Sequence, residues 1–172
     1  MQTKPSRFEF TSVNLSRKEK EEAYEEVLKQ VDAVLEGESH VILKMATINC
    51  LLREALPYYF WTGFYLVHEG ELIVGPYQGT VGCLHISFDR GVCGAAAKTE
   101  KTQIVFDVNK FSGHIACDSK SRSEIVVPVF NSKKELIAVF DVDSTELGSF
   151  DEVDKKYLEK LLHTQFAIVS SS

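Results

Sequence analysis

The chain lacks any long apolar run. No stretch approaches the roughly 18 consecutive apolar residues that a membrane-spanning helix needs. Residues 1–14, MQTKPSRFEFTSVN, also lack the apolar centre of a secretory signal peptide. We therefore expect a cytoplasmic protein without a membrane partner. In that reducing compartment, cysteines are more often catalytic or metal-binding than structural.

Basic residues are outnumbered. The sequence has 19 Lys and Arg against 25 Asp and Glu, which gives a net charge of −6. Nucleic acids and anionic membranes both require a basic face on the protein that binds them. The composition therefore argues against both as partners, and it leaves small cationic or zwitterionic ligands open.

Several common enzyme motifs are missing. No glycine-rich phosphate loop follows a predicted strand, and no nucleophile elbow of the hydrolase type occurs. Internal repeats and Pro/Gly/Ser-rich linkers are also missing. We therefore expect residues 1–172 to form a single domain, with residues 1–14 as a loosely docked arm.

The pattern of apolar residues predicts an α+β fold. Helices are expected to cover a central antiparallel sheet of about six strands. The predicted helices are residues 16–37, 41–56, 91–98 and a last one that begins near residue 149. The predicted strands are residues 59–67, 71–77, 84–88, 103–108, 123–130 and 135–142.

Three local predictions accompany these elements. Ser16 with Glu19 and Ser149 with Glu152 each have the spacing of a capping box at the start of a helix. Cys50 lies within the apolar pattern of the second helix, so we predict that it is a small buried core residue.

The other three cysteines lie in loop-like stretches. They are Cys83, Cys93 and Cys117, and the last belongs to the central segment FSGHIACDSKSRSEIVVPVF at residues 111–130. A thiol in a loop beside titratable groups is a plausible place for thiol chemistry. Redox chemistry would need one cysteine that attacks an oxidised substrate and becomes a sulfenic acid. A second cysteine would then form a disulfide with it, and an external thiol donor would reduce that disulfide.

Zinc binding is the alternative for these cysteines. The candidate ligands would be Cys83, His85, Cys93, His114 and Cys117. None of the cysteines forms a C-x-x-C pair, and the spacings match no usual zinc module. We therefore predict no metal site.

Acidic and aromatic side chains offer a second group of candidates. Asp141 and Asp143 are two residues apart near the end of a predicted strand, so their side chains share one face. Glu124 stands at the start of another strand. A solvated sheet edge would explain the acids equally well. Trp61 and Tyr65 could likewise be ordinary core residues rather than the wall of a ligand site.

A series of short motifs carries a resemblance to a known family. The motifs are W-x-G-F-Y at 61–65, G-P-Y-Q-G at 75–79, Cys83, G-V-C-G at 91–94, D-V at 107–108, G-H-I-A-C-D at 113–118, S-E-I-V-V-P at 123–128 and D-V-D-S at 141–144. Over about residues 20–168 the sequence resembles the free methionine-(R)-sulfoxide reductases, which are built on a GAF domain. Ser112 departs from that pattern, since the family often has proline there.

The resemblance implies a GAF-like fold and reduction of free L-methionine-(R)-sulfoxide to L-methionine. Cys117 resembles the attacking cysteine, Cys83 its disulfide partner, and Cys93 an auxiliary cysteine able to resolve or relay. No bound cofactor is implied. Thioredoxin is the implied electron donor, and a homodimer is common in the family.

The resemblance also assigns the substrate-binding residues. Trp61 and Tyr65 resemble the walls that hold the methyl end of the substrate. The acids Glu124, Asp141 and Asp143 resemble the groups that hold its polar ends. Clustered carboxylates can pair with the ammonium group that a peptide-bound methionine lacks. Neighbouring like charges also raise a carboxyl pKa, so one acid could stay protonated and donate to the sulfoxide oxygen.

Two other functions compete with the reductase. A GAF sensor that binds a small molecule or a cyclic nucleotide would keep the fold and the aromatic pocket, but it would not need three loop cysteines. A thiol redox switch would form its disulfide with peroxide as readily as with methionine sulfoxide. A purely structural domain with incidental cysteines is the remaining alternative.

Overall fold

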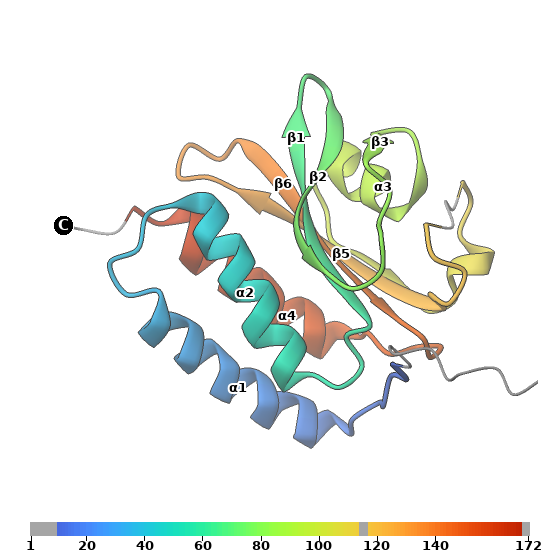
Figure 1. Cartoon of the computed structure of the whole chain (residues 1–172), viewed down its shortest axis with the longest axis horizontal. Helices are drawn as coiled ribbons and strands as arrows, with labels where there is room; N and C mark the ends of the chain where they lie inside the picture. The colour runs from blue at the N-terminus through green and yellow to red at the C-terminus, as the bar shows by residue number, and fades with distance from the viewer. Residues whose placement is uncertain (1–9, 114–116, 170–172) are drawn as a thin grey trace, which may run out of the picture.

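A computed structural model describes residues 10–113 and 117–169 of the 172-residue chain. Its centre is a six-stranded sheet with the order β3-β2-β1-β6-β5-β4, and every neighbouring pair is antiparallel (Figure 1). The strands are β1 (Trp61–His68), β2 (Glu71–Gln78), β3 (His85–Ser87), β4 (Gln103–Val105), β5 (Ser123–Phe130) and β6 (Leu136–Ser144).

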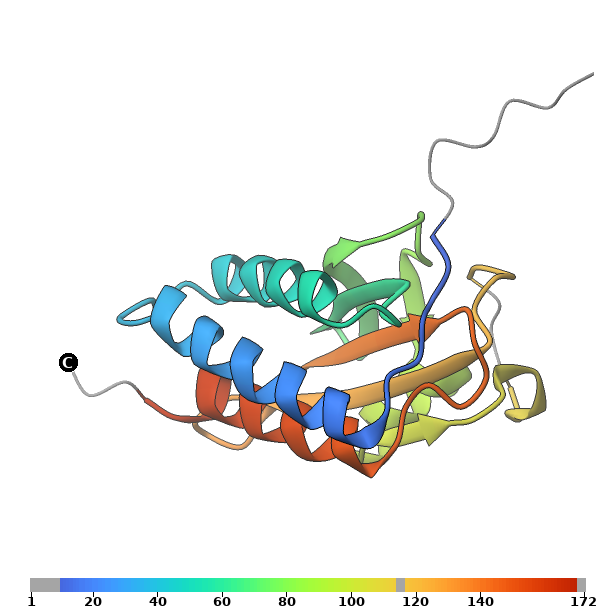
Figure 2. The same cartoon turned by 90° about the horizontal axis from the view of Figure 1, so that it is seen from below.

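Helices cover both faces of this sheet. Three of them, α1 (Arg17–Val34), α2 (Val41–Ala55) and α4 (Glu152–Leu162), lie on one face, and α3 (Gly91–Thr99) lies on the other (Figures 1 and 2). A short 3-10 helix, η1 (Val108–Lys110), precedes β5, and a π-helical turn, η2 (His163–Ala167), extends α4. Each face of the sheet therefore has its own apolar core.

The predicted α+β class and the antiparallel six-stranded sheet are confirmed. Element ends differ by a few residues. The strand predicted at 103–108 stops at Val105, because the chain turns there into η1. The last strand continues to Ser144, so Asp143, which follows the predicted strand 135–142, lies within β6 together with Asp141.

One predicted capping box is confirmed and the other is wrong. Ser16 and Glu19 cap α1 as predicted. At α4 the N-cap is Asp151, whose partner in the box is Asp154. The hydroxyl of Ser149 points back to Ser144 instead, because the chain before α4 is still turning away from β6.

The prediction that Cys50 is buried is also wrong, because its side chain is exposed. The buried stripe of α2 consists of Lys44, Met45, Ile48, Asn49 and Leu52. Cys50 lies on the opposite side of the helix from the centre of this stripe. Two polar residues, Lys44 and Asn49, lie in this buried stripe. Because polar residues usually mark the exposed face of a helix, the sequence pattern does not reveal which face of α2 is buried.

The N-terminal segment contacts the body of the domain. Ser12 donates its N–H to Thr145 and its hydroxyl to the carbonyl of Tyr58. Residues 1–9 of the predicted arm lie outside the described residues. No helix of the described part of the chain is long and apolar enough to cross a membrane.

Candidate active site

Strand register gathers the predicted acids and Trp61 on the α3 face of the sheet. Asp143 of β6 lies opposite Trp61 of β1 on one side and opposite Glu124 of β5 on the other. Asp141 lies opposite Gly63 and Val126. Side chains that oppose each other across antiparallel strands share a face and touch. The consecutive strands β5 and β6 thus build one acidic patch beside an aromatic ring of the distant strand β1.

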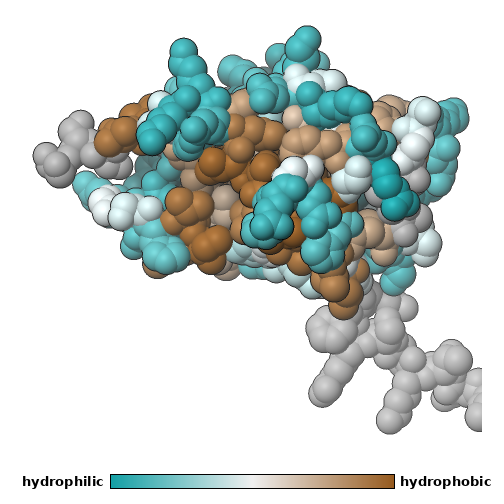
Figure 3. All heavy atoms as spheres, turned by 90° about the horizontal axis from the view of Figure 1, so that it is seen from above, coloured by the Kyte–Doolittle hydropathy of each residue, from teal (hydrophilic) through white to brown (hydrophobic). Residues whose placement is uncertain are grey.

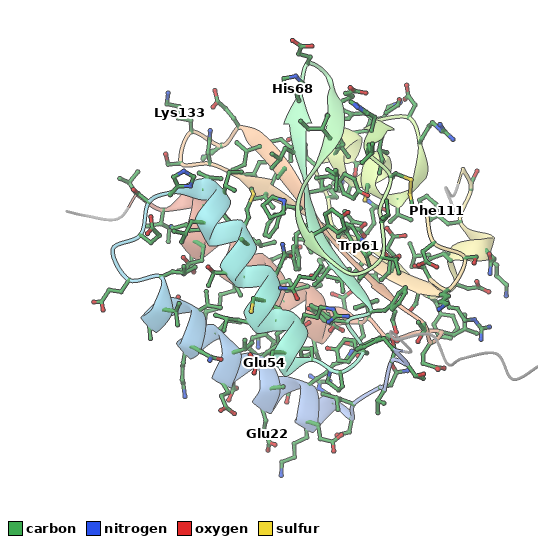
Figure 4. The ribbon with its side chains drawn as sticks, in the orientation of Figure 1. Glu22, Glu54, Trp61, His68, Phe111 and Lys133 are labelled. Atoms are coloured by element: carbon green, nitrogen blue, oxygen red, sulfur yellow. A yellow bond between two sulfur atoms is a disulfide. The ribbon has the colours of Figure 1, made fainter. Side chains whose placement is uncertain are left out.

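Glycines give the Trp61 ring its room. The indole stacks between Tyr65, at 5.7 Å between centroids, and Tyr77, at 5.2 Å. A Cβ atom at Gly63 would lie only 2.7 Å from the ring, and one at Gly82 only 2.9 Å. In Figure 4, Trp61 lies where β1, β2 and the loop after β2 meet. The aromatic cluster is therefore both core and pocket wall.

Helix α3 places Cys93 against the acids. Gly94 allows the helix to approach the chain after β3, since a Cβ there would lie 2.6 Å from the carbonyl oxygen of Ser87. The buried Cys93 thiol donates to Glu124, with Sγ 4.0 Å from Oε1. Burial raises the pKa of the Cys93 thiol, and the charges of Asp141 and Glu124 raise it further. Cys93 is therefore a protonated thiol at neutral pH.

Glu124 and Asp141 are buried side by side, and Asp143 next to them is half-buried. Burial raises the pKa of Asp141 to about 6, and the pKa of Glu124 is raised by burial and by the charges of Asp141 and Asp143. Burial and the charge of Asp141 likewise raise the pKa of Asp143. None of these acids takes part in an ion pair among the described residues. Within residues 10–113 and 117–169, Oδ1 of Asp141 is buried and accepts no hydrogen bond.

Cys83 and Cys117 are joined by a disulfide, and their Cα atoms lie 5.5 Å apart. Cys83 comes from the loop between β2 and β3, and Cys117 from the loop before β5. The Cys117 side chain is exposed, and that of Cys83 is partly so. Residues 114–116 of the G-H-I-A-C-D motif lie outside the described residues. Of the three loop cysteines, Cys93 is free and buried, and the two that solvent reaches form the pair.

These groups line one small pocket, which has a cavity volume of about 40 Å³ and is partly open to solvent. Its lining includes every predicted site residue except Cys83, which is held beside it through Cys117: Trp61, Tyr65, Cys93, Cys117, Glu124, Asp141 and Asp143. Residue-by-residue reasoning missed Arg90, Ser121 and Ile86, which also line it. The only available signal was their position next to the motifs, since Arg90 precedes G-V-C-G and Ser121 precedes S-E-I-V-V-P.

The zinc ligands considered from the sequence do not gather. Cys83 and Cys117 are in the disulfide, the Nδ1 atom of His85 contacts Glu71 at 2.8 Å, and His114 lies outside the described residues. A different set, Cys93, Glu124 and Asp141, has donor atoms within 4.8 Å of one another. The acidic patch could therefore hold a cation, whether a metal ion or an organic ammonium.

Comparison with known proteins identifies relatives of the chain. The GAF domain family model matches residues 49–167. The free methionine-R-sulfoxide reductase of Saccharomyces cerevisiae is 42% identical over 83% of this chain and 83% of its own length. The Escherichia coli protein of the same name is 40% identical over 83% and 86%. The structure of the Neisseria meningitidis enzyme of that name, solved with its substrate, superposes with a TM-score of 0.82, at 40% identity over 91% of this chain and 93% of that one.

Proposed function

The chain belongs to the free methionine-R-sulfoxide reductases, which are built on the GAF domain, and we propose that its pocket reduces free L-methionine-(R)-sulfoxide to L-methionine. The observation that carries the proposal is the pairing, in one pocket, of a cysteine disulfide with an acidic patch that has no counter-ion among the described residues. A sensor domain would have no use for the disulfide.

The acidic patch supports recognition of a free amino acid. We propose that the substrate ammonium group pairs with Glu124 and Asp141. It would donate a hydrogen bond to the Oδ1 atom of Asp141, which accepts none from the described residues. The methyl end would pack against Trp61 and Tyr65. Arg90 and the first turn of α3, which has no side-chain cap, would face the substrate carboxylate. A methionine inside a peptide lacks both charged ends, so it would leave the carboxylates unpaired.

The first chemical step is attack by Cys117. Its sulfur would bond to the sulfoxide sulfur of the substrate while the sulfoxide oxygen takes up a proton. An acid whose pKa is raised by burial, such as Asp143, is the proposed donor of that proton. Transfer of the oxygen to Cys117 leaves methionine and a Cys117 sulfenic acid. The substrate sulfur is thereby reduced by two electrons, and the Cys117 sulfur is oxidised by two electrons.

The second step closes the disulfide. The Cys83 thiol would attack the Cys117 sulfenic acid, which forms the S–S bond and releases water. A dithiol donor, proposed to be thioredoxin, would then return both cysteines to thiols and become a disulfide itself. We assign Cys93 to the substrate pocket rather than to this relay, because its thiol is buried and donates to Glu124. No bound cofactor is needed.

The remaining proposals concern the state of the protein. We propose that residues 1–172 act as one cytoplasmic domain and pair as a homodimer. Large apolar side chains are exposed where α1 ends, where α2 begins and beside the C-terminus: Val34, Val41, Ile42, Leu43, Ile168 and Val169. Figure 3 shows apolar atoms next to the C-terminal end of the chain. Such a patch favours burial against a second copy.

A coupled assay with thioredoxin, thioredoxin reductase and NADPH tests the function. The substrates are free methionine-R-sulfoxide, the free S epimer and a peptide that contains the R epimer, and Cys117→Ser is the control. Turnover of the free R epimer alone, abolished in the variant, supports the proposal. Equal turnover of the peptide would contradict recognition by the acids. A disulfide that forms with peroxide but with no sulfoxide would indicate a redox switch instead.

A further inference from the structure

The two loops that carry the disulfide are also joined by a hydrogen bond. The hydroxyl of Thr80 donates to Oδ2 of Asp118 at 2.6 Å. Thr80 lies three residues before Cys83, and Asp118 directly follows Cys117. The bond therefore spans the same two loops as the disulfide and lies close to it in both.

Each end of this bond is anchored to a defined part of the fold. The carbonyl oxygen of Thr80 accepts the indole N–H of Trp61 at 2.8 Å. The second carboxylate oxygen of Asp118 accepts the N–H of Lys120 at 2.8 Å, which holds the turn that leads into β5. Gly79, at φ +133°, lets the loop pass over the Trp61 ring, since a Cβ there would lie 2.7 Å from it. Trp61 thus fixes the Thr80 end of the bond to β1, and the turn at Lys120 orients the Asp118 end, while the bond itself lies at the surface.

We propose that Thr80 and Asp118 are positioning residues that hold the Cys83 loop against the Cys117 loop and so favour closure of the disulfide. This inference rests on the proposed roles of Cys83 and Cys117. The bond and the disulfide join the same two loops, so each favours formation of the other, and loss of the bond lowers the ratio of disulfide to dithiol. It also lowers the effective concentration of Cys83 at Cys117, because the Cys83 loop is then held by fewer contacts.

Thr80→Val tests this directly, because it removes the hydroxyl and keeps the β-branched shape and the carbonyl that Trp61 needs. The reduced protein is equilibrated in buffers of reduced and oxidised glutathione, and the Cys83–Cys117 disulfide is measured by alkylation and mass spectrometry. We expect the ratio of disulfide to dithiol to fall about fivefold, the usual weight of one such bond. That corresponds to about 20 mV for a two-electron couple.

Thr102→Val is the matched control. Thr102 also donates its hydroxyl to a carboxylate at 2.6 Å, that of Glu159, but far from the cysteines. The ratio of disulfide to dithiol in Thr102→Val should equal that of the unmodified protein. Thr80→Ser, which keeps the hydroxyl, should also have the ratio of the unmodified protein. Asp118→Ala should shift the ratio at least as far as Thr80→Val. The double variant should shift it no further than Asp118→Ala, because both changes remove the same bond.

A kinetic measurement separates positioning from chemistry. With one equivalent of methionine-R-sulfoxide, Thr80→Val should form methionine at the normal rate but close the disulfide about fivefold more slowly. A larger fraction of Cys117 sulfenic acid should then be trapped by dimedone. Equal ratios in Thr80→Val and Thr102→Val would overturn the proposal, as would an equal slowing of both steps. The glutathione measurement uses no sulfoxide, so it stands even if the proposed substrate is wrong.

Discussion

Two groups of charged and polar side chains lie on opposite faces of the sheet, and they differ in how their buried charges are paired. On the helix face, Asp154 is fully buried and pairs with the buried ammonium group of Lys20. Tyr24 and Tyr58 both donate to its other oxygen, at 2.7 and 2.6 Å. On the α3 face, Glu124, Asp141 and Asp143 have no cation in the described part of the chain, and one oxygen of Asp141 has no partner.

The difference teaches how to tell a structural polar cluster from a binding site. A buried charge is costly unless it is paired and hydrogen-bonded. The cluster around Asp154 meets that requirement with its own residues, so it needs no ligand. The acidic patch meets it only by taking up protons or by binding a cation from outside. Incomplete pairing in a pocket, rather than burial of charge as such, marks the site.

Breaking the cluster around Asp154 should have the largest effect on the free energy of unfolding. Lys20→Met leaves the Asp154 carboxylate buried without its cation, which should cost about 3–5 kcal/mol of the free energy of unfolding. Urea denaturation measures this loss. Turnover per folded molecule should not change, because the pocket lies on the other face of the sheet.

Lys18→Met on the same helix is the control. Lys18 is exposed and pairs only with Glu22, at 3.8 Å, so its loss should cost no more than about 0.5 kcal/mol. If Lys20→Met costs as little as that, the cluster is not held by its ion pair and the comparison fails.

Asp141→Asn should have the opposite signature, a large loss of activity with a gain in stability. It removes a carboxylate that the proposed ammonium group needs, so kcat/KM should fall about 100-fold. It also removes a buried charge that lacks a partner. The free energy of unfolding at pH 8 should therefore rise by about 1–3 kcal/mol. The exposed Asp89→Asn, which loses only its pairing with Lys98, should change neither quantity much.

The pH dependence sharpens this prediction. The pKa of Asp141 is raised from 3.8 to about 6 in the folded protein, mainly by burial. Between these values the folded state binds more protons than the unfolded state, so this contribution to stability is complete below about pH 4 and is lost as the pH rises through 6. Activity should instead rise with pH through about 6, because ammonium binding needs the ionised acid. Asp141→Asn should flatten the stability profile. A loss of stability in this variant at pH 8 would show that the carboxylate is held structurally.

The motifs of the sequence point to residues that share one pocket, but no local pattern points to the cluster around Asp154. Motif residues from three strands were assigned to one site, and the strand register does place Trp61, Asp143 and Glu124 side by side. Nothing in the local pattern of α1 marked Lys20 as buried, because its partner Asp154 is 134 positions away. A lysine in a helical pattern indicates an exposed position unless the tertiary partner is known.

The same reason explains the errors in the helices. Cys50 was predicted to be buried from the apolar character of α2, but Asn49 takes the buried position and donates to the carbonyl of Pro76 at 2.7 Å. The capping box of α4 was shifted by two residues, because Asp151 and Asp154 compete with Ser149 and Glu152 at the same spacing. The tertiary contacts of Asp154 with Lys20, Tyr24 and Tyr58 favour the second pair.

The smallest predicted effect on activity is that of Cys93→Ser. This variant tests whether Cys93 belongs to the acidic patch or takes part in forming the Cys83–Cys117 disulfide. Cys93→Ser keeps a hydroxyl donor of similar size beside Glu124, so kcat should stay within about threefold, with a modest rise in KM. The Cys83–Cys117 disulfide should still form after one turnover, as mass spectrometry can show. Cys50→Ser, at an exposed position on the other face, is the matched control and should leave both constants unchanged. If Cys93→Ser instead accumulates the Cys117 sulfenic acid, the buried thiol must reach Cys117 during catalysis.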